Sequence, residues 1–175
     1  MTIGVISDTH DRFDTLEPAI RTFKKEGAGL VVHCGDWIAP FTVAKIVMLV
    51  KEHLGCPLKG VFGNNDGDLF SILAKNYAQG WDIEFSDTIL ELEFDGRKIA
   101  VYHGTDRAIT DSLITSKHYD AVFSGHTHVP LNETREGVLV LNPGSTSYIR
   151  NGSIIDEATV AVYDTAANKA EIIQL

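Results

Sequence analysis

Five stretches of the sequence end an apolar run with residues that commonly bind metal ions. Each run reaches a small residue and then an Asp, Asn or His, in segments 5–10, 31–36, 61–66, 100–104 and 122–128. Mixed oxygen and nitrogen donors without thiolate suit manganese, iron, zinc, nickel or cobalt better than magnesium or calcium. A carboxylate can bind two ions through its two oxygens, so Asp36 is a candidate bridge between cations about 3.5–4 Å apart. The pattern predicts a two-metal enzyme.

The spacing of the other candidate ligands supports shared binding. In an extended chain, side chains two positions apart point the same way. Asp8 and His10 can therefore bind one ion together, and His126 and His128 can face the same cluster. Two further candidates stand alone and offer a neutral carbonyl oxygen and a neutral imidazole nitrogen: Asn64 and His103.

Each of these residues also has an ordinary structural explanation. A lone aspartate at a strand end is more often a helix cap or a turn residue than a ligand. A lone histidine such as His103 is more often hydrogen-bonded or on the surface. The pair in Gly125-His126-Thr127-His128 is more specific, because two protonated histidines repel each other unless a metal keeps them neutral. The joint occurrence of five such signals, each after an apolar run, favours the metal site.

Hydrophobic patterning indicates the elements that position these residues. The apolar runs lack alternation, which is typical of strands buried on both faces, and ligands collect at strand ends in open α/β sheets. Helix-like segments between the runs predict βαβ units and a largely parallel sheet in the first half. Cap residues and helical spacing predict four helices: one capped by Asp14 that ends near Gly27, one that begins at Pro40, one at 68–80 and one at 109–117.

The second half of the sequence adds antiparallel strands. Asp95-Gly96 is a strong signal for a tight turn between strands at 88–94 and 98–102. Further strands are expected at 120–124, 137–141, 159–163 and 169–173, with residues 166–169 turning the last two into a hairpin. Two sheets with helices outside them would house this order of elements.

Composition limits the classes of protein that fit. The 175 residues with 44% hydrophobic content form one substantial core, so we expect a single domain over residues 1–175. A formal charge of −9 argues against an extended nucleic acid or an anionic membrane as partner. With two cysteines, no apolar run of about 18 residues and no signal-peptide core, the expected location is the cytoplasm.

The ordered motifs resemble those of the calcineurin-like metallophosphoesterases, specifically their compact prokaryotic phosphodiesterase branch. The order Asp-x-His, Gly-Asp, Gly-Asn-x-Asp, His-Gly, Gly-His-x-His recurs over residues 3–147, and Asn142-Pro143-Gly144-Ser145 is similar to the family's late turn. The resemblance implies an α/β fold, a two-sheet β-sandwich flanked by helices, with a dinuclear site at the strand ends. It also implies a division of the ligands: Asp8, His10 and His128 hold the first ion, Asn64, His103 and His126 the second, and Asp36 bridges both.

The chain departs from the family pattern beside these ligands. Many relatives carry His after the metal-binding Asn, whereas this chain has Asn65, which can hydrogen-bond a phosphate but cannot protonate a leaving alkoxide. We therefore expect weaker catalysis or a dependence on good leaving groups. Thr105 stands where some relatives have a second His, and Asp66 is interpreted as a residue that orients a ligand or Asn65. Arg12 could reach a substrate oxygen, although surface arginine is commonplace.

The resemblance, together with the complete ligand set, implies a hydrolase, a metal-dependent phosphodiesterase acting on small phosphodiesters. The nucleophile would be a hydroxide generated between two divalent ions, with manganese the first candidate and zinc, nickel, iron or cobalt the alternatives. Two other functions stay open. A protein-binding scaffold on the same fold is disfavoured by the intact ligands, and a metal-dependent nuclease by the acidic charge. The sequence does not determine the oligomeric state and leaves a homo-oligomer open.

Overall fold

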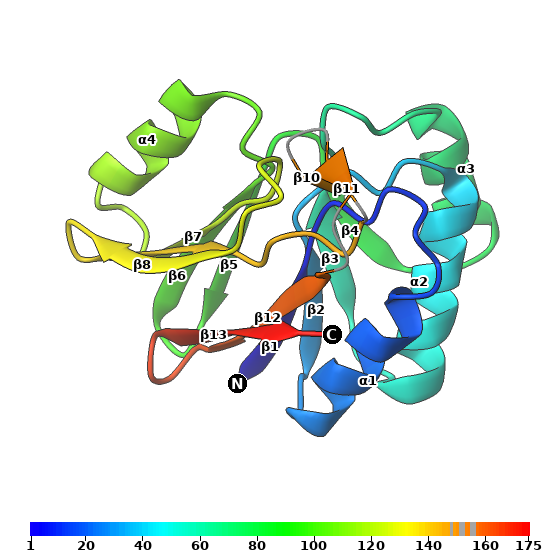
Figure 1. Cartoon of the computed structure of the whole chain (residues 1–175), viewed down its shortest axis with the longest axis horizontal. Helices are drawn as coiled ribbons and strands as arrows, with labels where there is room; N and C mark the ends of the chain where they lie inside the picture. Colours follow the sequence, from blue (N-terminus) through cyan, green and yellow to red (C-terminus); the bar gives the residue numbers. More distant parts are fainter. Residues whose placement is uncertain (148, 151–152, 155–156) are drawn as a thin grey trace.

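The computed structural model describes residues 1–147, 149–150, 153–154 and 157–175, and two large β-sheets face each other in it (Figure 1). The first sheet has the strand order β13-β12-β1-β2-β3-β4. Strands β1 to β4 run parallel, while β12 and β13 are antiparallel to their neighbours. Its strands are β1 (Thr2–Ile6), β2 (Leu30–His33), β3 (Leu58–Val61), β4 (Ile83–Ser86), β12 (Thr159–Asp164) and β13 (Lys169–Gln174).

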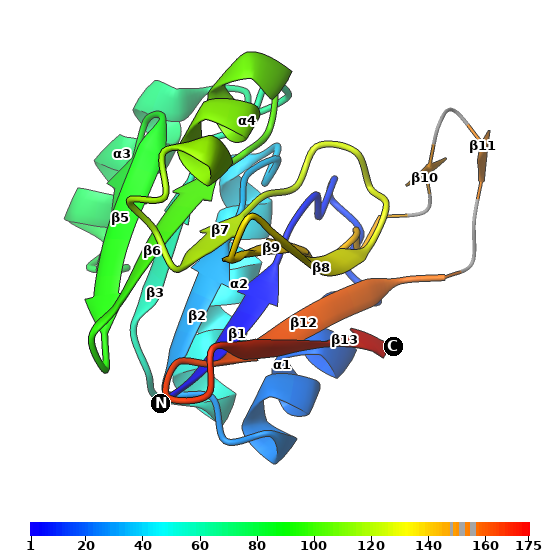
Figure 2. The ribbon, with the colours of Figure 1, turned by 90° about the vertical axis from the view of Figure 1, so that its left-hand side faces the viewer.

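The second sheet has the order β5-β6-β7-β9-β8 and lies in front of the first in Figure 2. Its inner strands β6, β7 and β9 are parallel, and β5 and β8 are antiparallel edge strands. Their bounds are β5 (Ile89–Phe94), β6 (Arg97–Tyr102), β7 (Ala121–Phe123), β8 (Leu131–Arg135) and β9 (Val138–Asn142). A small separate ladder joins β10 (Ile149–Arg150) to β11 (Ser153–Ile154).

Helices cover the outer faces of both sheets and complete four layers. The first sheet carries α1 (Leu16–Lys25), α2 (Pro40–His53) and α3 (Leu69–Ala78), and the second carries α4 (Arg107–Thr115) (Figure 1). This helix, sheet, sheet, helix order confirms the predicted fold class. Among the described residues, no helix combines the length and apolarity that crossing a bilayer requires.

The helices form where amphipathic spacing meets suitable end residues. Helix α1 buries Leu16, Ile20 and Phe23 on one face, and Pro40 occupies the first turn of α2, where its missing N–H has no partner to lose. The prediction of Asp14 as the cap of α1 is wrong, because the N-cap is Thr15. The Thr15 hydroxyl lies 2.9 Å from the backbone oxygen of Thr146, so it ties the helix start to a distant loop.

The core between the two sheets holds the strands in register. Val5 and Val32 of the first sheet pack with Val101 and Phe123 of the second, and all four side chains are fully buried. Burial of each such side chain stabilises the fold by roughly 1.5–3 kcal/mol. The strands that carry the candidate ligand segments are therefore fixed by the most buried part of the molecule.

Two edge strands were not expected from the sequence. Strand β8 reads Leu-Asn-Glu-Thr-Arg, with one apolar residue, and strand β4 has four residues. Both take their conformation from a neighbouring strand rather than from a buried face of their own. Helix α4 also begins earlier than predicted, because the Asp106 side chain caps it by accepting a hydrogen bond from the backbone N–H of Ala108 at 2.8 Å.

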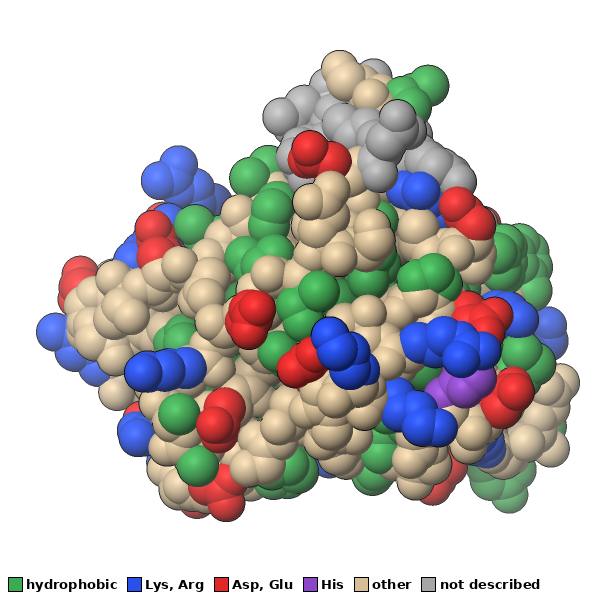
Figure 3. Space-filling model, turned by 60° about the horizontal axis from the view of Figure 1, so that its bottom comes forward, with side chains coloured by type: hydrophobic (Ala, Val, Ile, Leu, Met, Phe, Trp, Pro, Cys, Tyr) green, Lys and Arg blue, Asp and Glu red, His purple; other side chains and the backbone are tan. Residues whose placement is uncertain are grey.

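Charged side chains of both signs occur on the face of the molecule shown in Figure 3. On this face, acidic and basic side chains are interspersed and do not form a continuous basic band.

Candidate metal centre

The five candidate segments meet at one rim of the molecule because each follows the carboxyl end of a parallel strand. Strands β1, β2 and β3 are neighbours in the first sheet, and β6 and β7 are neighbours in the second. Backbone hydrogen bonds tie the loops that follow: Asp8 N–H donates to Gly35 O at 3.0 Å, and Gly125 N–H donates to His103 O at 2.8 Å. Residues far apart in sequence are therefore brought to a common edge.

Four ligand-type side chains form a compact group on one side of this rim. One donor atom from each of Asp8, His10, Asp36 and His128 lies within 4.8 Å of the donor atoms of the other three. His10 Nε2 is 3.3 Å from Asp36 Oδ2, and His128 Nε2 is 3.2 Å from Asp8 Oδ1. Both aspartates are buried, so water screens their negative charges weakly. These charges therefore act strongly on the histidines beside them.

Asp36 also faces a second set of donors. Its Oδ1 lies 3.4 Å from His103 Nε2, which in turn lies 3.1 Å from Asn64 Oδ1. The His126 ring stands 5.2 Å from the His103 ring, measured between centroids. The two carboxylate oxygens of Asp36 thus point toward two different groups of potential ligands.

The backbone reaches this arrangement through an uncommon conformation rather than through extended strands. Five of the ligand-type residues have positive φ: Asp8 at 52°, His10 at 41°, Asp36 at 61°, His126 at 68° and His128 at 58°. Residues other than glycine rarely adopt this left-handed conformation, which costs of order 1–3 kcal/mol each and clusters at functional sites. The surrounding contacts must therefore impose it.

This finding corrects the argument from alternating side chains. Strands β1 and β7 end before the ligands begin, so spacing along an extended chain does not pair them. His128 lies beside His10, with ring centroids 4.9 Å apart, whereas His126 lies beside His103. The two histidines of this segment therefore face different neighbours within the same candidate site.

Two glycines allow the ligands to approach closely. A Cβ on Gly63 would collide with Asp36 Oδ1 and lie 2.8 Å from His103 Nε2. A Cβ on Gly125 would collide with Ser7 Oγ and lie 2.6 Å from Asp8 Oδ2. The small residue at the end of each apolar run was the sequence signal for these positions, although it did not reveal what they make room for.

The late Asn-Pro-Gly-Ser turn braces two of the ligand loops. The Asn142 side-chain amide donates to the Gly125 backbone oxygen at 2.7 Å and to Thr127 Oγ1 at 3.1 Å. The Ser145 hydroxyl donates to the Asp8 backbone oxygen at 2.8 Å. This turn contributes no ligand, and its effect is to fix the backbone that carries them.

Asp66 and Asn65 both contact Asp36, Asp66 at its backbone N–H and Asn65 at its side-chain carboxylate. The Asp66 carboxylate accepts backbone N–H bonds from Gly63 and Ile38, each at 2.7 Å, and from Asp36 at 3.1 Å. The Asn65 side-chain amide donates to Asp36 Oδ2 at 2.7 Å. Asp66 thus joins the loops after β2 and β3, and Asn65 holds the carboxylate itself.

Arg12 has a more constrained position than a surface loop charge. Its side chain is 9% exposed, and its guanidinium donates to the Ser147 backbone oxygen at 3.2 Å and to Asp14 Oδ1 at 3.3 Å. It stands outside the ligand group, two residues after His10.

His33 and Trp37 lie behind the site in the core. The His33 ring stacks on Trp37 with centroids 3.7 Å apart, and His33 Nδ1 accepts the Gly35 N–H at 3.1 Å. Burial lowers the pKa of His33 to about 3, so it is neutral. Trp37 is fully buried and donates to the Val61 backbone oxygen, so it packs in the core and does not line a cleft.

The electrostatics of the site couple its acids to its histidines. Burial acts to raise the pKa of Asp8, but hydrogen bonds with His10 and His128 lower it to about 2. Burial likewise opposes charge on His10, but the Asp36 and Asp8 carboxylates raise its pKa to about 9. Burial opposes the charge of Asp36 and of His103 as well, but their contact with each other stabilises both charges. The pKa of Asp36 is therefore well below its ordinary value, and the pKa of His103 is above its ordinary value. The site therefore attracts positive charge.

The orientation of the histidines fits a metal cation. His103 Nδ1 lies 2.8 Å from the Cys34 carbonyl oxygen, which can only accept, so Nδ1 carries a proton. Nε2 then faces the oxygens of Asn64 and Asp36, an arrangement that a proton on Nε2 satisfies in the charged ring and a cation between these atoms satisfies in the neutral ring. His10 Nε2 is also buried and faces Asp36 Oδ2 at 3.3 Å, in a geometry outside that of a regular hydrogen bond. These donors fit a divalent metal ion bound by nitrogen and oxygen ligands.

Comparison with known proteins agrees with this chemistry. The family model of the calcineurin-like phosphoesterase superfamily domain matches residues 1–168. A phosphodiesterase of Methanocaldococcus jannaschii is 32% identical over 166 residues, which cover 94% of this chain and 93% of that protein.

Solved structures agree with the family match. The structure of an archaeal phosphodiesterase superposes with a TM-score of 0.85 at 30% identity and covers 100% of both chains. Vps29 of Entamoeba histolytica, complexed with zinc, shares the fold with a TM-score of 0.66 at 16% identity and 99% coverage of both chains. The chain belongs to the calcineurin-like phosphoesterase superfamily.

Proposed function

We propose that the protein is a metal-dependent phosphodiesterase that hydrolyses small phosphodiesters at a site for two divalent metal ions. One observation carries this proposal: the carboxylate of Asp36 stands between two groups of donors, with Oδ2 toward His10 and Oδ1 toward His103. A carboxylate in this position can serve two ions at once. The phosphodiesterase relatives support the choice of reaction.

Each side of Asp36 would hold one ion, and the donor types favour manganese, with zinc, nickel, iron or cobalt as alternatives. When bound, the ions supply Lewis-acid charge that activates water and attracts a phosphate oxygen. The first ion would take Asp8, His10 and His128, the second Asn64, His103 and His126, and both would share Asp36.

The protein's own groups would do the positioning work. Asp66 keeps Asp36 in its left-handed conformation through the backbone N–H bond at 3.1 Å. Asn65 can move its amide from Asp36 to a phosphate oxygen, and the guanidinium of Arg12 supplies a charge for another oxygen. Asn65 cannot protonate a leaving alkoxide, so turnover depends on the acidity of the leaving group.

The setting we propose for this activity is cytoplasmic, in a single domain spanning residues 1–175. Both cysteines, Cys34 and Cys56, are free, in keeping with a reducing compartment. The formal charge of −9 favours small phosphodiesters over extended nucleic acid.

Substitution of Asp36 tests the proposal. Asp36→Asn keeps the size of the side chain and tolerates the left-handed backbone, but it removes the charge shared by both donor groups. We expect hydrolysis of bis(4-nitrophenyl) phosphate, measured with added manganese, to fall at least about a hundredfold, in the range of lost metal or electrostatic catalysis. The matched control is Asp82→Asn, a loop aspartate with the same positive φ of 61° that is exposed and lies outside the site.

Three outcomes would contradict the proposal. Full activity of Asp36→Asn would show that Asp36 does not bridge the ions. A wild-type protein that binds no divalent metal and instead retains a protein partner would indicate a scaffold. Faster cleavage of single-stranded oligonucleotides than of small diesters would indicate a nuclease.

A further inference from the structure

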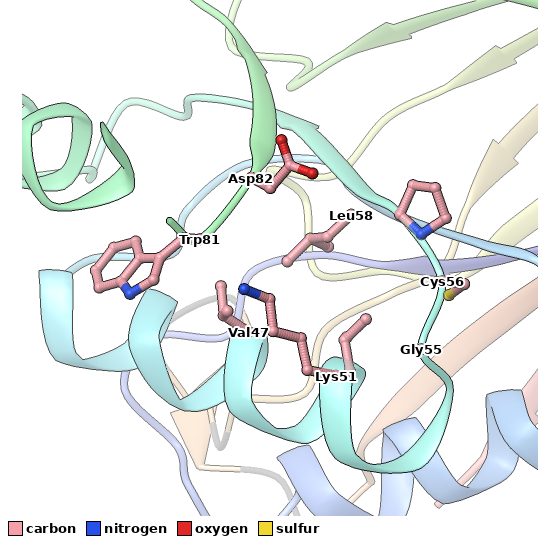
Figure 4. A pocket seen from close by; sticks show the side chains of 9 residues that line it. Val47, Lys51, Gly55, Cys56, Leu58, Trp81 and Asp82 are labelled. Atoms are coloured by element: carbon pink, nitrogen blue, oxygen red, sulfur yellow. The ribbon is translucent and has the colours of Figure 1, made fainter. Parts of the chain in front are cut away.

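Two cavities differ in their relation to the candidate metal centre. One, of about 320 Å³, lies between α2 and the starts of β3 and β4, with Lys51, Trp81 and Asp82 around it (Figure 4). It sits at the edge opposite the ligand loops, and Lys51 Nζ already donates to the Gly80 backbone oxygen. The other cavity has a volume of about 540 Å³. Its lining includes the candidate ligand His126 and two residues of the ligand loops, Thr105 and Gly125, and we name it the α4 cavity.

The α4 cavity opens directly beside the candidate metal centre. His126 forms part of its wall, and Thr105 Oγ1 lies 3.5 Å from Asn64 Oδ1. From there the cavity extends between the start of α4 and strands β8 and β9, as far as Arg135. A phosphodiester held at the metal centre would have one of its ester groups next to this space.

The walls combine an apolar side with two cations. Val129, Leu131 and Val140 line the cavity from the second sheet and its loop. Arg107 and Arg135 also line it. A volume of about 300–1,000 Å³ with apolar walls and a few convergent polar groups is typical of sites for small molecules.

The charge balance of the lining is unusual for this chain. The whole protein carries 24 acidic against 15 basic residues, yet the cavity is lined by two arginines and one acid, Asp111. Arg107 Nε lies 3.5 Å from Asp111 Oδ2, both side chains are exposed, and Arg135 is paired with Glu133 outside the cavity. Exposed ion pairs are weak, so both guanidinium groups can turn to an anionic ligand.

We propose that the α4 cavity binds one ester group of the substrate and selects a group with an apolar body and an oxyanion at its end. The apolar body packs on Leu131 and Val140, and Arg107 and Arg135 bind the oxyanion, a carboxylate or a phosphonate-like group. This inference rests on the proposed phosphodiesterase function and adds the class of its substrate.

Three probes that share one leaving group test the selection. They are 4-nitrophenyl phosphodiesters whose second ester group is phenyl, 3-carboxyphenyl or 3-phosphonophenyl. The readout is the ratio of kcat/KM for each charged probe to that for the phenyl probe. We expect the wild type to prefer at least one charged probe about tenfold, as for a charge-assisted Arg contact that is partly shielded from water, and the larger ratio identifies the oxyanion.

Variants of the two arginines locate the source of the preference. The double variant Arg107→Gln with Arg135→Gln should bring the ratio close to one. Arg21→Gln is the matched control, because Arg21 forms the same kind of exposed ion pair along a helix, with Glu17, far from the cavity. It should leave the ratio unchanged.

A steric pair of variants tests occupation of the cavity independently of charge. Thr110 lines the cavity on α4 and Thr115 on the same helix does not, so Thr110→Trp fills the space and Thr115→Trp is its control. Thr110→Trp should reduce kcat/KM for the phenyl probe relative to a methyl 4-nitrophenyl phosphate about tenfold, a loss of the size expected when a ring loses its pocket.

The outcomes separate this inference from the function on which it rests. If the wild type hydrolyses the three aryl probes equally well, or if the double arginine variant keeps the preference, the selection by the α4 cavity is overturned while the phosphodiesterase function stands. An unchanged phenyl-to-methyl ratio in Thr110→Trp also overturns it. If the wild type hydrolyses no probe with any of the five transition metals, the proposed function fails and this inference fails with it.

Discussion

The Ser145 hydroxyl donates a hydrogen bond to the backbone oxygen of Asp8 at 2.8 Å, across 137 positions of sequence. The same Ser145 oxygen accepts the Ser147 N–H at 2.9 Å, which fixes the hydroxyl in place. Asp8 needs such support because its φ is 52°. The late turn thus stabilises the conformation of a ligand loop formed at the start of the chain.

Removal of this hydroxyl should weaken both metal binding and folding. Ser145→Ala leaves the buried Asp8 carbonyl without this partner, at a cost of about 1–3 kcal/mol. We expect the affinity for manganese, measured by calorimetry, to fall about tenfold, and Tm to fall by about 2–4 °C per kcal/mol lost from the fold. Ser112→Ala, which removes an exposed hydroxyl on α4, is the control. Unchanged affinity in Ser145→Ala would separate the turn from the site.

Gly63 is predicted to tolerate no side chain. Its Cβ would collide with Asp36 and approach His103, so Gly63→Ala must displace groups on both sides of the candidate bridge. We expect metal affinity and activity each to fall about 10–100-fold, the range seen when ligand orientation is disturbed. Gly67→Ala is a close control, because its Cβ meets nothing nearer than 3.9 Å, from Ile38 O. Comparable losses in the two variants would contradict the steric argument.

The part of this structure that could be predicted is the part that depends on burial. Most of the length of strands β1, β2, β6 and β7 is buried on both faces, and this leaves an apolar run in the sequence that can be read locally. The fold class followed from these runs and the helices between them. Strand β8 could not be found this way, because its pairing with β9 rather than its own composition makes it extended.

The loops show where local sequence is insufficient. The left-handed conformations of Asp36 and Ile38 are held by Asp66, whose carboxylate accepts backbone N–H bonds from both. Such a conformation depends on a residue about 30 positions away, and no pattern around Asp36 specifies it. The family resemblance assigned His126 and His128 to different ions, whereas their local spacing did not distinguish their directions.

The metal-free protein should lose stability as the pH rises from neutral. The pKa of His10 is about 9 in the folded chain against an ordinary 6.5, so the folded state holds its proton more tightly. The stabilisation is complete below about pH 6.5 and is lost as the pH rises through about 9. We expect Tm of chelator-treated protein to fall across this window, and the fall to be smaller in His10→Gln. His118→Gln, at an exposed position outside the site, should retain it.

Metal binding should follow the opposite trend over the same pH range. A metal ion must displace the proton from His10, so affinity for manganese should rise between pH 6.5 and 9 and binding should release protons. Calorimetry in buffers with different ionisation enthalpies measures that release. An affinity that does not change with pH would argue that His10 is not a ligand.

Asn65 offers a direct test of the role of the leaving group. The residue is exposed and its side chain contacts Asp36 Oδ2, so a histidine can be placed there without disturbing the core. Asn65→His supplies an imidazole that can protonate a leaving alkoxide, an effect typically worth about 10²–10⁴-fold in rate. We expect the variant to gain on diesters with alkyl leaving groups and to change little on 4-nitrophenyl esters, which need no proton.

The dependence of log kcat on leaving-group pKa measures this gain. It should be steep in the wild type and shallower in Asn65→His, with a new ionisation near the pKa of histidine in the rate profile of the alkyl esters. Asn65→Ala is the control, because it removes the amide that contacts Asp36 without adding a proton donor. If Asn65→His and Asn65→Ala share the wild-type slope, the proton does not limit the reaction, and the amide of Asn65 acts only by holding the Asp36 carboxylate in place.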